Sequence, residues 1–399
     1  MNRNRQQTSL ICLACLGLAL ALLLSRTSRF AEDPELIYEQ ALALVEAEQF
    51  DQAESVMQRL RKSRPPTVLD HGLQARVDIA KGRVDQAIDN LSVIPDDHPL
   101  AGWARLRCGQ LERSRMRFRK AENWLQETLR IDENSVEARR ELVYVYGMQL
   151  RRSVLHDQFR KLNRLTTLKA KEIWVWCMVR DLAWWHPEEH IPILERAIGV
   201  DAEDYWSRIA LAEVLRRQGH TDQAMLMLEQ SPVDRIELLA KRLELLLDQQ
   251  DLEQVQKSLE KIPLNEPNVA TLRGRLAMSN GDTKSALKFF ELSEEFESGK
   301  REVIANLGQA LLQAGDQKKG KIYLQKAGQI DKLNNMLLQL EKTIESSGVE
   351  TWRTLGSTCE SADRLAEARA WQSLIIANNP FDQTAQTAVF RIDEKMKTP

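Results

Sequence analysis

Small residues recur along this chain at a nearly constant interval of 34 positions. Ala53, Ala87 and Ala121 show that interval without deviation. Later members of the series follow at less even spacing: Ala224, Ala286, Gly320 and Ala368. A second small residue stands twelve positions before each member: Ala41, Ala75, Gly109, Ala212, Gly274, Gly308 and Gly356. A fixed period of this length is typical of an array of supersecondary units. The paired small residues predict two closely packed helices in each unit.

The breaks between helices fall where such an array requires them. Helical periodicity dominates from Pro34 onward, and no stretch shows sustained strand-like alternation. In four units a glycine stands about five residues before the small residue of the second helix: Gly82, Gly219, Gly281 and Gly315. Prolines mark the breaks between units, because proline removes a backbone donor and clashes with the preceding turn. Together these signals predict an all-α fold of helix–turn–helix units.

The composition is that of an ordinary soluble domain, with 29% charged residues, 43% hydrophobic residues and a net charge of −2. A nearly neutral chain has no overall bias toward nucleic acid. Five cysteines are too few and too scattered for a disulfide framework. Cys108, Cys177 and Cys359 fall on predicted first helices, where we expect buried, reduced thiols. No Cys-x-x-Cys pair occurs after residue 25, which excludes a structural zinc ribbon.

The first 25 residues form a separate feature. Residues 6–25 carry no charge, and a helix of that length spans about 30 Å, the thickness of the hydrocarbon core of a bilayer. We expect an uncleaved transmembrane helix within residues 1–25 and a polar linker at 26–33; a cleaved signal peptide is the alternative. Arg3 and Arg5 precede the apolar run and Arg26 and Arg29 follow it, so these charges indicate no orientation.

Two segments resemble the tetratricopeptide repeat (TPR), whose consensus is Trp-x-x-Leu-Gly-x-x-Tyr, then Ala-x-x-x-Phe-x-x-Ala, then Pro. One is Trp352-x-x-Leu355-Gly356, followed by Ala368 and Pro380. The other is Ile304-x-x-Leu307-Gly308-x-x-Leu311, followed by Gly320 and Ala327. The resemblance implies a right-handed superhelical solenoid of about ten repeats over residues 34–382. We expect an extra helix near 334–347 within it and a capping helix at 383–399.

Three units depart from the pattern. The units near 136–170 and 171–204 place larger residues at the small positions, namely Val143, Leu155, Met178 and His190, and the unit near 236–266 is short. Five of the nine tryptophans lie in the same region: Trp174, Trp176, Trp184, Trp185 and Trp206. Trp174 occupies the core tryptophan position of the family. Trp184 and Trp185 either fill space left by the irregular units or anchor a partner, and we favour packing.

The resemblance also implies a binding surface, because the first helices of TPR arrays line a concave groove that takes extended or helical peptides. The family's groove positions fall on seven residues: Trp103, Arg113, Arg140, Tyr144, Trp206, Arg216 and Arg217. Aromatic rings give contact area at low entropy cost, and arginine pairs bidentately with carboxylates. We therefore expect protein or peptide partners, including acidic ones. The alternative is a solvated face with ordinary packing aromatics.

Positive charge is concentrated between Trp103 and Lys171, where 17 Lys or Arg stand against 8 Asp or Glu. A solvated basic face accounts for this excess without a ligand. Acidic peptides or lipid headgroups could also use it. Nucleic acid is not expected as a partner, since no recognised reading motif accompanies the stretch.

The segment His186-Pro187-Glu188-Glu189-His190 matches the His-x-x-Glu-His signature of inverted zinc peptidases. That chemistry needs both imidazoles on one helical face, whereas the residue before a proline is pushed to extended conformations. We interpret the match as chance. The chain also lacks a phosphate-binding loop, a nucleophile elbow and a dinucleotide fingerprint. No enzymatic activity, catalytic residue, metal or cofactor is expected.

Two functional hypotheses follow. The first is a membrane-tethered TPR scaffold that binds partners in its groove for complex assembly. It would be a single-pass membrane protein held through residues 6–25, with the array on the extracytoplasmic side, the periplasm if the protein is bacterial. The second is a cell-envelope biogenesis factor resembling the lipopolysaccharide-assembly TPR proteins. Members of that family end in a four-cysteine metal module, which this chain lacks.

Overall fold

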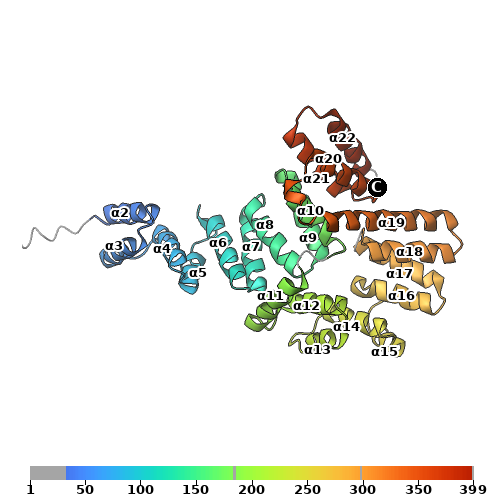
Figure 1. Ribbon diagram of the computed structural model, residues 1–399. Coiled ribbons are helices and arrows are strands. Elements are labelled where there is room, and N and C mark those ends of the chain that lie inside the picture. Colours follow the sequence, from blue (N-terminus) through green and yellow to red (C-terminus); the bar gives the residue numbers. More distant parts are fainter. Residues whose placement is uncertain (1–32, 183–185, 297–298, 398–399) are drawn as a thin grey trace, which may run out of the picture. The chain divides into compact units, whose positions relative to one another are not determined.

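The computed structural model describes residues 33–182, 186–296 and 299–397; the expected membrane helix and the linker up to residue 32 lie outside these ranges. The described residues form α-helices joined by short connections, with two short 3-10 segments and no strand (Figure 1). None of these helices is long and apolar enough to span a membrane. The all-α prediction is confirmed for the described part of the chain.

The helices have the following bounds: α2 Pro34–Glu46, α3 Phe50–Ser63, α4 Val68–Ala80, α5 Val84–Ser92, α6 Ala101–Ser114, α7 Phe118–Ile131, α8 Val136–Met148, α9 Arg152–Leu165, α10 Ala170–Val179, α11 Pro187–Val200, α12 Tyr205–Arg217, α13 Thr221–Glu229, α14 Ile236–Asp248, α15 Leu252–Leu259, α16 Ala270–Ser279, α17 Thr283–Phe296, α18 Arg301–Gln313, α19 Gln317–Leu340, α20 Val349–Ser361, α21 Leu365–Asn378 and α22 Gln383–Lys397. The 3-10 segments are η1 (Pro267–Val269) and η2 (Ile344–Ser346).

The chain divides into two compact units, one ending at Cys108 and the other beginning at Gly109. In unit 1, α2 packs against α3 and α4 packs against α5. In unit 2 the corresponding pairs are α8 with α9, α12 with α13, α14 with α15, α16 with α17, α18 with α19 and α20 with α21. Each unit is therefore built from neighbouring helix pairs, as expected for a repeat array.

The small residues of the 34-residue series lie where the two helices of a pair touch. Ala53 and Ala87 are completely buried. The glycine positions leave no room for a side chain. A Cβ on Gly109 would lie 2.7 Å from the side chain of Leu125, and one on Gly274 would lie 2.5 Å from Cδ1 of Phe290. The series therefore marks close helix–helix packing, as predicted.

The turns inside the pairs share one backbone geometry. Nine of them contain a single residue with φ between 53° and 90°, in the left-handed region. Four of these residues are the glycines expected from the sequence, and the other five are Glu48, Met116, Leu150, Gln250 and Asp363. In the α4–α5 turn, the N–H of Arg83 bonds to the carbonyl oxygen of Asp78 at 2.8 Å, which closes the end of α4.

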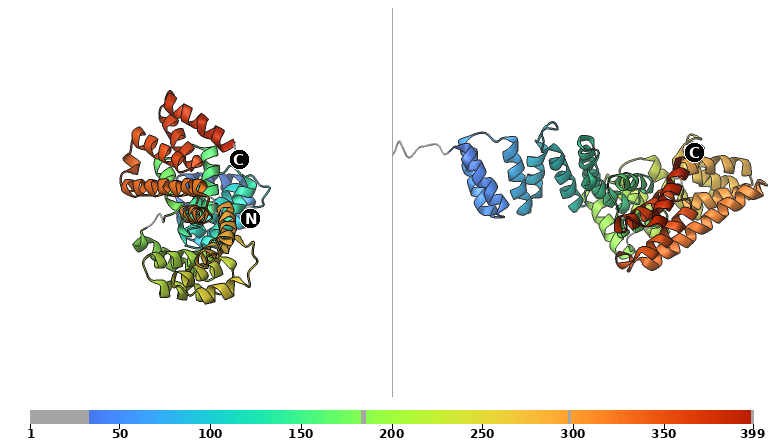
Figure 2. Two further views of the ribbon diagram at one scale, coloured as in Figure 1. Left: turned by 90° about the vertical axis from the view of Figure 1, so that its right-hand side faces the viewer. Right: turned by 90° about the horizontal axis from the view of Figure 1, so that it is seen from above.

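Helix α10 is the first helix of the irregular repeat at 171–204, and it packs against helices that are distant in the sequence. It packs against α19, α21 and η2, and Figure 1 shows it among these C-terminal helices. The views in Figure 2 likewise show the green segment around α10 among the orange and red helices. The next helix along the chain, α11, packs against α12 instead. Unit 2 therefore closes on itself through α10.

Asp181, just after α10, is the polar centre of this closure. Its carboxylate forms an ion pair with Arg364 and accepts a hydrogen bond from the backbone N–H of Arg301 at 3.0 Å. Asn334 of α19 lies 3.4 Å from the same carboxylate. Burial alone would raise the pKa of Asp181, but Arg364 and these hydrogen bonds lower it overall. Asp181 is therefore held ionised by three C-terminal segments.

The structure differs from the prediction of a separate helix near 334–347. Helix α19 runs without interruption for 24 residues, so residues 334–340 are its last turns, and the short segment η2 follows. No glycine or proline stands between Gly328 and Ser347 to end the helix earlier. The expected C-terminal helix corresponds to α22, which packs against α21.

Candidate partner-binding grooves

Unit 1 contains a groove of about 710 Å³ that is lined by the first helices of its pairs. Tyr38 and Leu42 come from α2, Leu73 from α4, and Leu100 and Trp103 from the α6 side. Gly72 allows the side chains of Leu100 and Trp103 to pack closely against α4, because a Cβ at this position would lie 3.3 Å from Leu100 and 3.9 Å from Trp103. The groove is thus an apolar trough lined by three partly exposed aromatic rings, those of Tyr38, Phe50 and Trp103.

The acidic and basic residues that line this groove come from different helices. Glu46 and Glu48 line it at the end of α2, whereas the exposed Arg76 and Arg107 line it from α4 and α6. The phenol of Tyr38 keeps its proton at neutral pH, since burial, and then the charge of Asp70, raise its pKa. The groove therefore offers an apolar floor, a hydroxyl donor, an anionic side at the end of α2 and a cationic side along α4 and α6.

The predicted arginines of unit 2 are already paired with carboxylates of this chain. Arg113 forms an ion pair with Glu141, and its guanidinium lies 4.7 Å from the centre of the Tyr144 ring. Arg140 binds Glu172 at 2.8 Å. Both ion pairs join the first helices of successive repeats: α6 to α8 through Arg113 and Glu141, and α8 to α10 through Arg140 and Glu172. They therefore stabilise the register between repeats and lower the positive charge that a partner would meet.

Arg216 and Arg217 converge on Glu213, a carboxylate that the sequence analysis missed. Glu213 accepts hydrogen bonds from Arg216 at 3.0 Å and from Arg217 at 2.6 Å, and Lys241 lies 3.0 Å away. Burial opposes ionisation, but Lys241 and the two guanidinium groups lower the pKa of Glu213 strongly. Arg216 also reaches Asp248 of α14 at 3.1 Å. The only sequence signal for this hub was the spacing of Glu213 to the arginines three and four positions later.

The aromatic groove residues of unit 2 lie in two separate cavities. Trp206 lines a cavity of about 530 Å³ together with Glu213 and Lys241, and the guanidinium of Arg151 lies 4.8 Å from its ring. Tyr144 lines another cavity, of about 730 Å³, with Arg140. Of the seven predicted residues, Trp206, Tyr144 and Arg140 thus line two cavities of unit 2, and Trp103 lines the groove of unit 1.

The tryptophans at the start of the irregular region serve packing. Trp174 and Trp176 on α10 are both buried. The indole N–H of Trp174 donates to the carbonyl oxygen of Leu337 at 2.8 Å, and that of Trp176 donates to Nδ1 of His156 at 2.9 Å. Trp184 and Trp185 lie outside the described residues, so their expected packing role remains a prediction.

The two histidines of the His-x-x-Glu-His match engage different partners. His186 is extended, with φ −63° and ψ 147°, and its Nε2 lies 2.9 Å from Glu341. His190 is completely buried on α11, and its Nε2 lies 2.7 Å from the carbonyl oxygen of Met148. Among the described residues, no group of three or more His, Cys, Asp or Glu is arranged to hold a metal ion. His186 has the extended conformation expected before a proline.

No protein-family model matches the chain, and no curated protein matches it either. Solved structures with a similar helical arrangement include a tetratricopeptide repeat protein from Parabacteroides merdae, at 14% identity over 61% of this chain and 98% of that chain, with a TM-score of 0.32. The Cut9–Hcn1 structure of the APC/C matches at 15% identity over 96% of this chain and 82% of that chain, with a TM-score of 0.35.

The TPR domain of P58(IPK) matches at 15% identity over 92% of this chain and all of that chain, with a TM-score of 0.27. Similarities of this size carry no argument about partners or activity. The architecture therefore rests on the chain's own repeated helix pairs, shared turn geometry and buried small residues.

Proposed function

We propose that this chain is a membrane-tethered scaffold that binds peptide segments of protein partners for complex assembly, with the unit 1 groove as its binding site. The partly exposed ring of Trp103 over an apolar floor carries the proposal. Tryptophan, tyrosine and arginine dominate the energetics of protein interfaces, and this groove presents all three. In unit 2 the predicted groove arginines form ion pairs with the chain's own carboxylates.

The groove favours a peptide with an apolar side chain followed by an acidic one. The apolar side chain would fill the trough over Gly72 and Leu73, next to Trp103. The acidic side chain would face Arg76 and Arg107, where a guanidinium can bind a carboxylate bidentately. Binding of this kind needs no catalytic group, consistent with the expectation that the chain is not an enzyme.

A peptide array probed with the purified full-length chain tests the site. We expect selected peptides to combine apolar and acidic residues, and Trp103→Ala to weaken their binding by roughly 10-fold or more. Arg107→Glu should shift the preference from acidic toward basic residues. Trp352→Ala is the control, because Trp352 is a partly exposed tryptophan in α20, far from this groove in sequence. Unchanged binding in Trp103→Ala would contradict the site.

The tether is proposed on the sequence of residues 6–25 alone. Alkaline extraction of membranes from cells that express the full chain tests it. We expect the full chain to stay in the pellet and a variant lacking residues 1–25 to appear in the supernatant. Release of the full chain into the supernatant would contradict the tether without affecting the groove. Protease protection of the same membranes would show on which side the array lies.

A further inference from the structure

The cavity of about 730 Å³ beside Tyr144 in unit 2 is mostly apolar, and its volume is within the range of small-molecule sites. Its floor consists of four buried apolar residues from α8, α9 and α10: Val143, Phe159, Leu162 and Val175. The ring of Tyr144 is partly exposed beside this floor. Three consecutive helices therefore provide a continuous apolar surface.

Two aromatic side chains of this lining are held in place by neighbours outside it. Phe159 stacks on Trp176, with 5.5 Å between the ring centres and 12° between the ring planes. The guanidinium of Arg113 lies 4.7 Å from the centre of the Tyr144 ring. The surface is therefore formed before a ligand arrives, so binding costs little side-chain entropy.

The cavity does not continue along the array as a peptide groove would. Arg140 of α8 binds Glu172 of α10 at 2.8 Å, and Lys171 of α10 binds Glu345 of η2 at 2.8 Å. Helix α12, the first helix of the next repeat, contributes no residue to the lining. A compact ligand therefore fits this cavity better than an extended peptide that spans several repeats.

The charged residues that line the cavity leave one positive charge in excess. Arg140 and Lys171 are paired with the two carboxylates of the lining, Glu172 and Glu345. Lys169 also lines the cavity, is exposed, and forms no ion pair within the described ranges of the chain. A ligand with a single anionic group would complement this ammonium group while its apolar part covers the floor.

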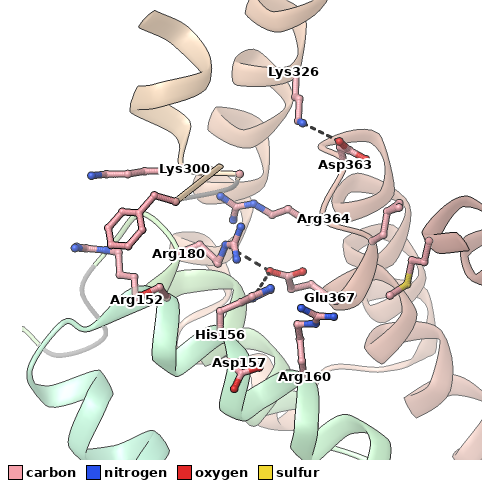
Figure 3. A pocket seen from close by; sticks show the side chains of 16 residues that line it. Arg152, His156, Asp157, Arg160, Arg180, Lys300, Lys326, Asp363, Arg364 and Glu367 are labelled. Carbon is pink, nitrogen blue, oxygen red and sulfur yellow. Dashed lines mark hydrogen bonds and ion pairs between the residues drawn. The ribbon is translucent and has the colours of Figure 1, made fainter. Parts of the chain in front are cut away.

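The cavity at the closure of unit 2, shown in Figure 3, is different because its charged side chains are joined to one another. Oε1 of Glu367 lies 3.6 Å from Nδ1 of His156 and 3.7 Å from Nε of Arg180. Lys326 binds Asp363 at 2.7 Å. These contacts link α9 and the end of α10 to α21, and α19 to the α20–α21 turn. They hold the closure together, which leaves the apolar cavity as the stronger candidate for a ligand.

We propose that the apolar cavity binds a soluble amphiphile with one anionic group at the end of a flexible apolar chain, which is the chemistry of a medium-chain fatty acid. The chain lies on Phe159 and Val175, and the carboxylate faces Lys169. Burial of the chain supplies most of the affinity, and the ammonium group supplies the preference for an anion. This site is distinct from the peptide groove of unit 1, so either assignment can fail without the other.

Calorimetric titration of the full-length chain with decanoate tests the site. We expect saturable binding of one decanoate per chain, and hexanoate should bind at least about 10-fold more weakly because it buries four CH₂ groups fewer. Decyltrimethylammonium has a chain of similar length and the opposite charge, so it should also bind at least about 10-fold more weakly. A variant lacking residues 1–25 should bind decanoate equally, since the cavity lies outside them.

Two variants separate the apolar floor from the charge. Ala170→Phe should weaken decanoate binding roughly 10-fold or more, because Ala170 is partly exposed in the lining and a ring there would fill the cavity. Lys169→Gln should reduce the preference for decanoate over decyltrimethylammonium by roughly 5-fold or more. Lys120→Gln is the matched control, since Lys120 is an exposed lysine of α7 outside the lining. Equal thermal unfolding midpoints would show that the variants fold.

Equal effects of Lys169→Gln and Lys120→Gln would show a diffuse charge effect and overturn the proposal. Full affinity in Ala170→Phe, or no saturable binding up to about 10 mM decanoate, would do the same. Displacement of bound decanoate by peptides selected on the array would assign the cavity to a peptide partner instead. Binding to vesicles that contain an anionic lipid, without binding of decanoate, would overturn the assignment to a soluble amphiphile.

Discussion

The indole N–H of Trp174 donates a hydrogen bond to the carbonyl oxygen of Leu337, 163 positions later in the chain. Leu337 is one of the last four residues of α19, which ends at Leu340, and the carbonyls of these residues have no partner within the helix. The sequence places Trp174 in the core of its own repeat, but its indole N–H caps the C-terminal end of α19, which belongs to a different repeat. This bond and the ion pair of Asp181 with Arg364 define the closure of unit 2.

Replacing Trp174 by Phe should destabilise unit 2. The variant leaves the carbonyl of Leu337 buried without its donor, which costs about 1–3 kcal/mol. Urea unfolding followed by circular dichroism measures the change. Trp352→Phe is the matched control, because the indole of Trp352 bonds to the nearby Ser347 at 2.9 Å in a partly exposed position. Equal losses in both variants would argue against a special role for Trp174.

Cys177 and Cys359 should form a disulfide under oxidation. Their sulfur atoms are 3.8 Å apart across the contact of α10 with α20. Oxidised glutathione would accept the two electrons and be reduced to two thiols, while the two cysteines join. The reaction should be slow, since both cysteines are buried and burial raises the pKa of Cys359 well above its usual value.

Peptide mapping without reduction identifies the linked pair. Cys108, which is buried in unit 1, should not join either partner, and Cys177→Ser should abolish the product. A disulfide between Cys108 and Cys177 would contradict the packing of α10. The absence of any disulfide after prolonged oxidation, at a temperature high enough to open the structure transiently, would contradict it as well.

Stability should fall between pH 7.5 and pH 5 because of His156. Burial is the main reason that the pKa of His156 is lowered to about 4. The negative charge of Glu367 raises this pKa, and the positive charges of Arg180, Arg160 and Arg364 lower it further. Below its usual pKa near 6.5 the unfolded chain binds a proton that the folded chain does not. The stabilising contribution is therefore complete above that pH and lost as the pH falls toward 4.

The expected loss from His156 at pH 5 is about 2 kcal/mol. His156→Gln keeps an acceptor for the indole of Trp176 and should flatten the pH dependence measured by urea unfolding. His220→Gln, at an exposed position with no such environment, should leave it unchanged. A His156→Gln slope equal to that of the native chain would rule out this cause.

Two glycine-to-alanine substitutions should have opposite signs. Gly274→Ala places a methyl group 2.5 Å from Cδ1 of Phe290, and overpacking of this kind costs about 1–3 kcal/mol. Gly328→Ala lies on an exposed face inside α19 with no atom within 4 Å, so it should stabilise by about 0.5–1 kcal/mol. Thermal unfolding compares them. Destabilisation by Gly328→Ala would show that α19 does not continue through that position.

The local features of the fold could be read from the sequence because they depend on neighbouring residues. Pairs such as Gly109 and Ala121 indicate where two helices touch, and Gly82 and Gly219 indicate the turns. The turn residues Met116 and Leu150 could not be recognised, since the left-handed conformation is imposed on them by the packing of the flanking helices rather than favoured by their own side chains.

The closure and the site could be predicted only in part. The larger residues Val143 and Met178 indicated that the array is irregular near 136–204, but nothing in the sequence shows that α10 packs against residues near 337 and 359. The pairing of Arg216 with Glu213, Glu244 and Asp248 also depends on which helices are neighbours. A resemblance to a regular TPR array therefore overestimates how much free positive charge the groove presents.

The position of α10 also has a consequence for synthesis of the chain on the ribosome. Cys177 precedes its neighbour Cys359 by 182 residues, and translation at roughly 5–20 residues per second needs on the order of 10–40 s to supply them. Throughout that time the side chains of Trp174 and Trp176 have left the exit tunnel before the C-terminal helices that bury them exist. During synthesis the nascent chain therefore exposes the apolar helix α10, which is prone to aggregate unless a chaperone binds it. Premature termination before α19 would leave α10 permanently exposed.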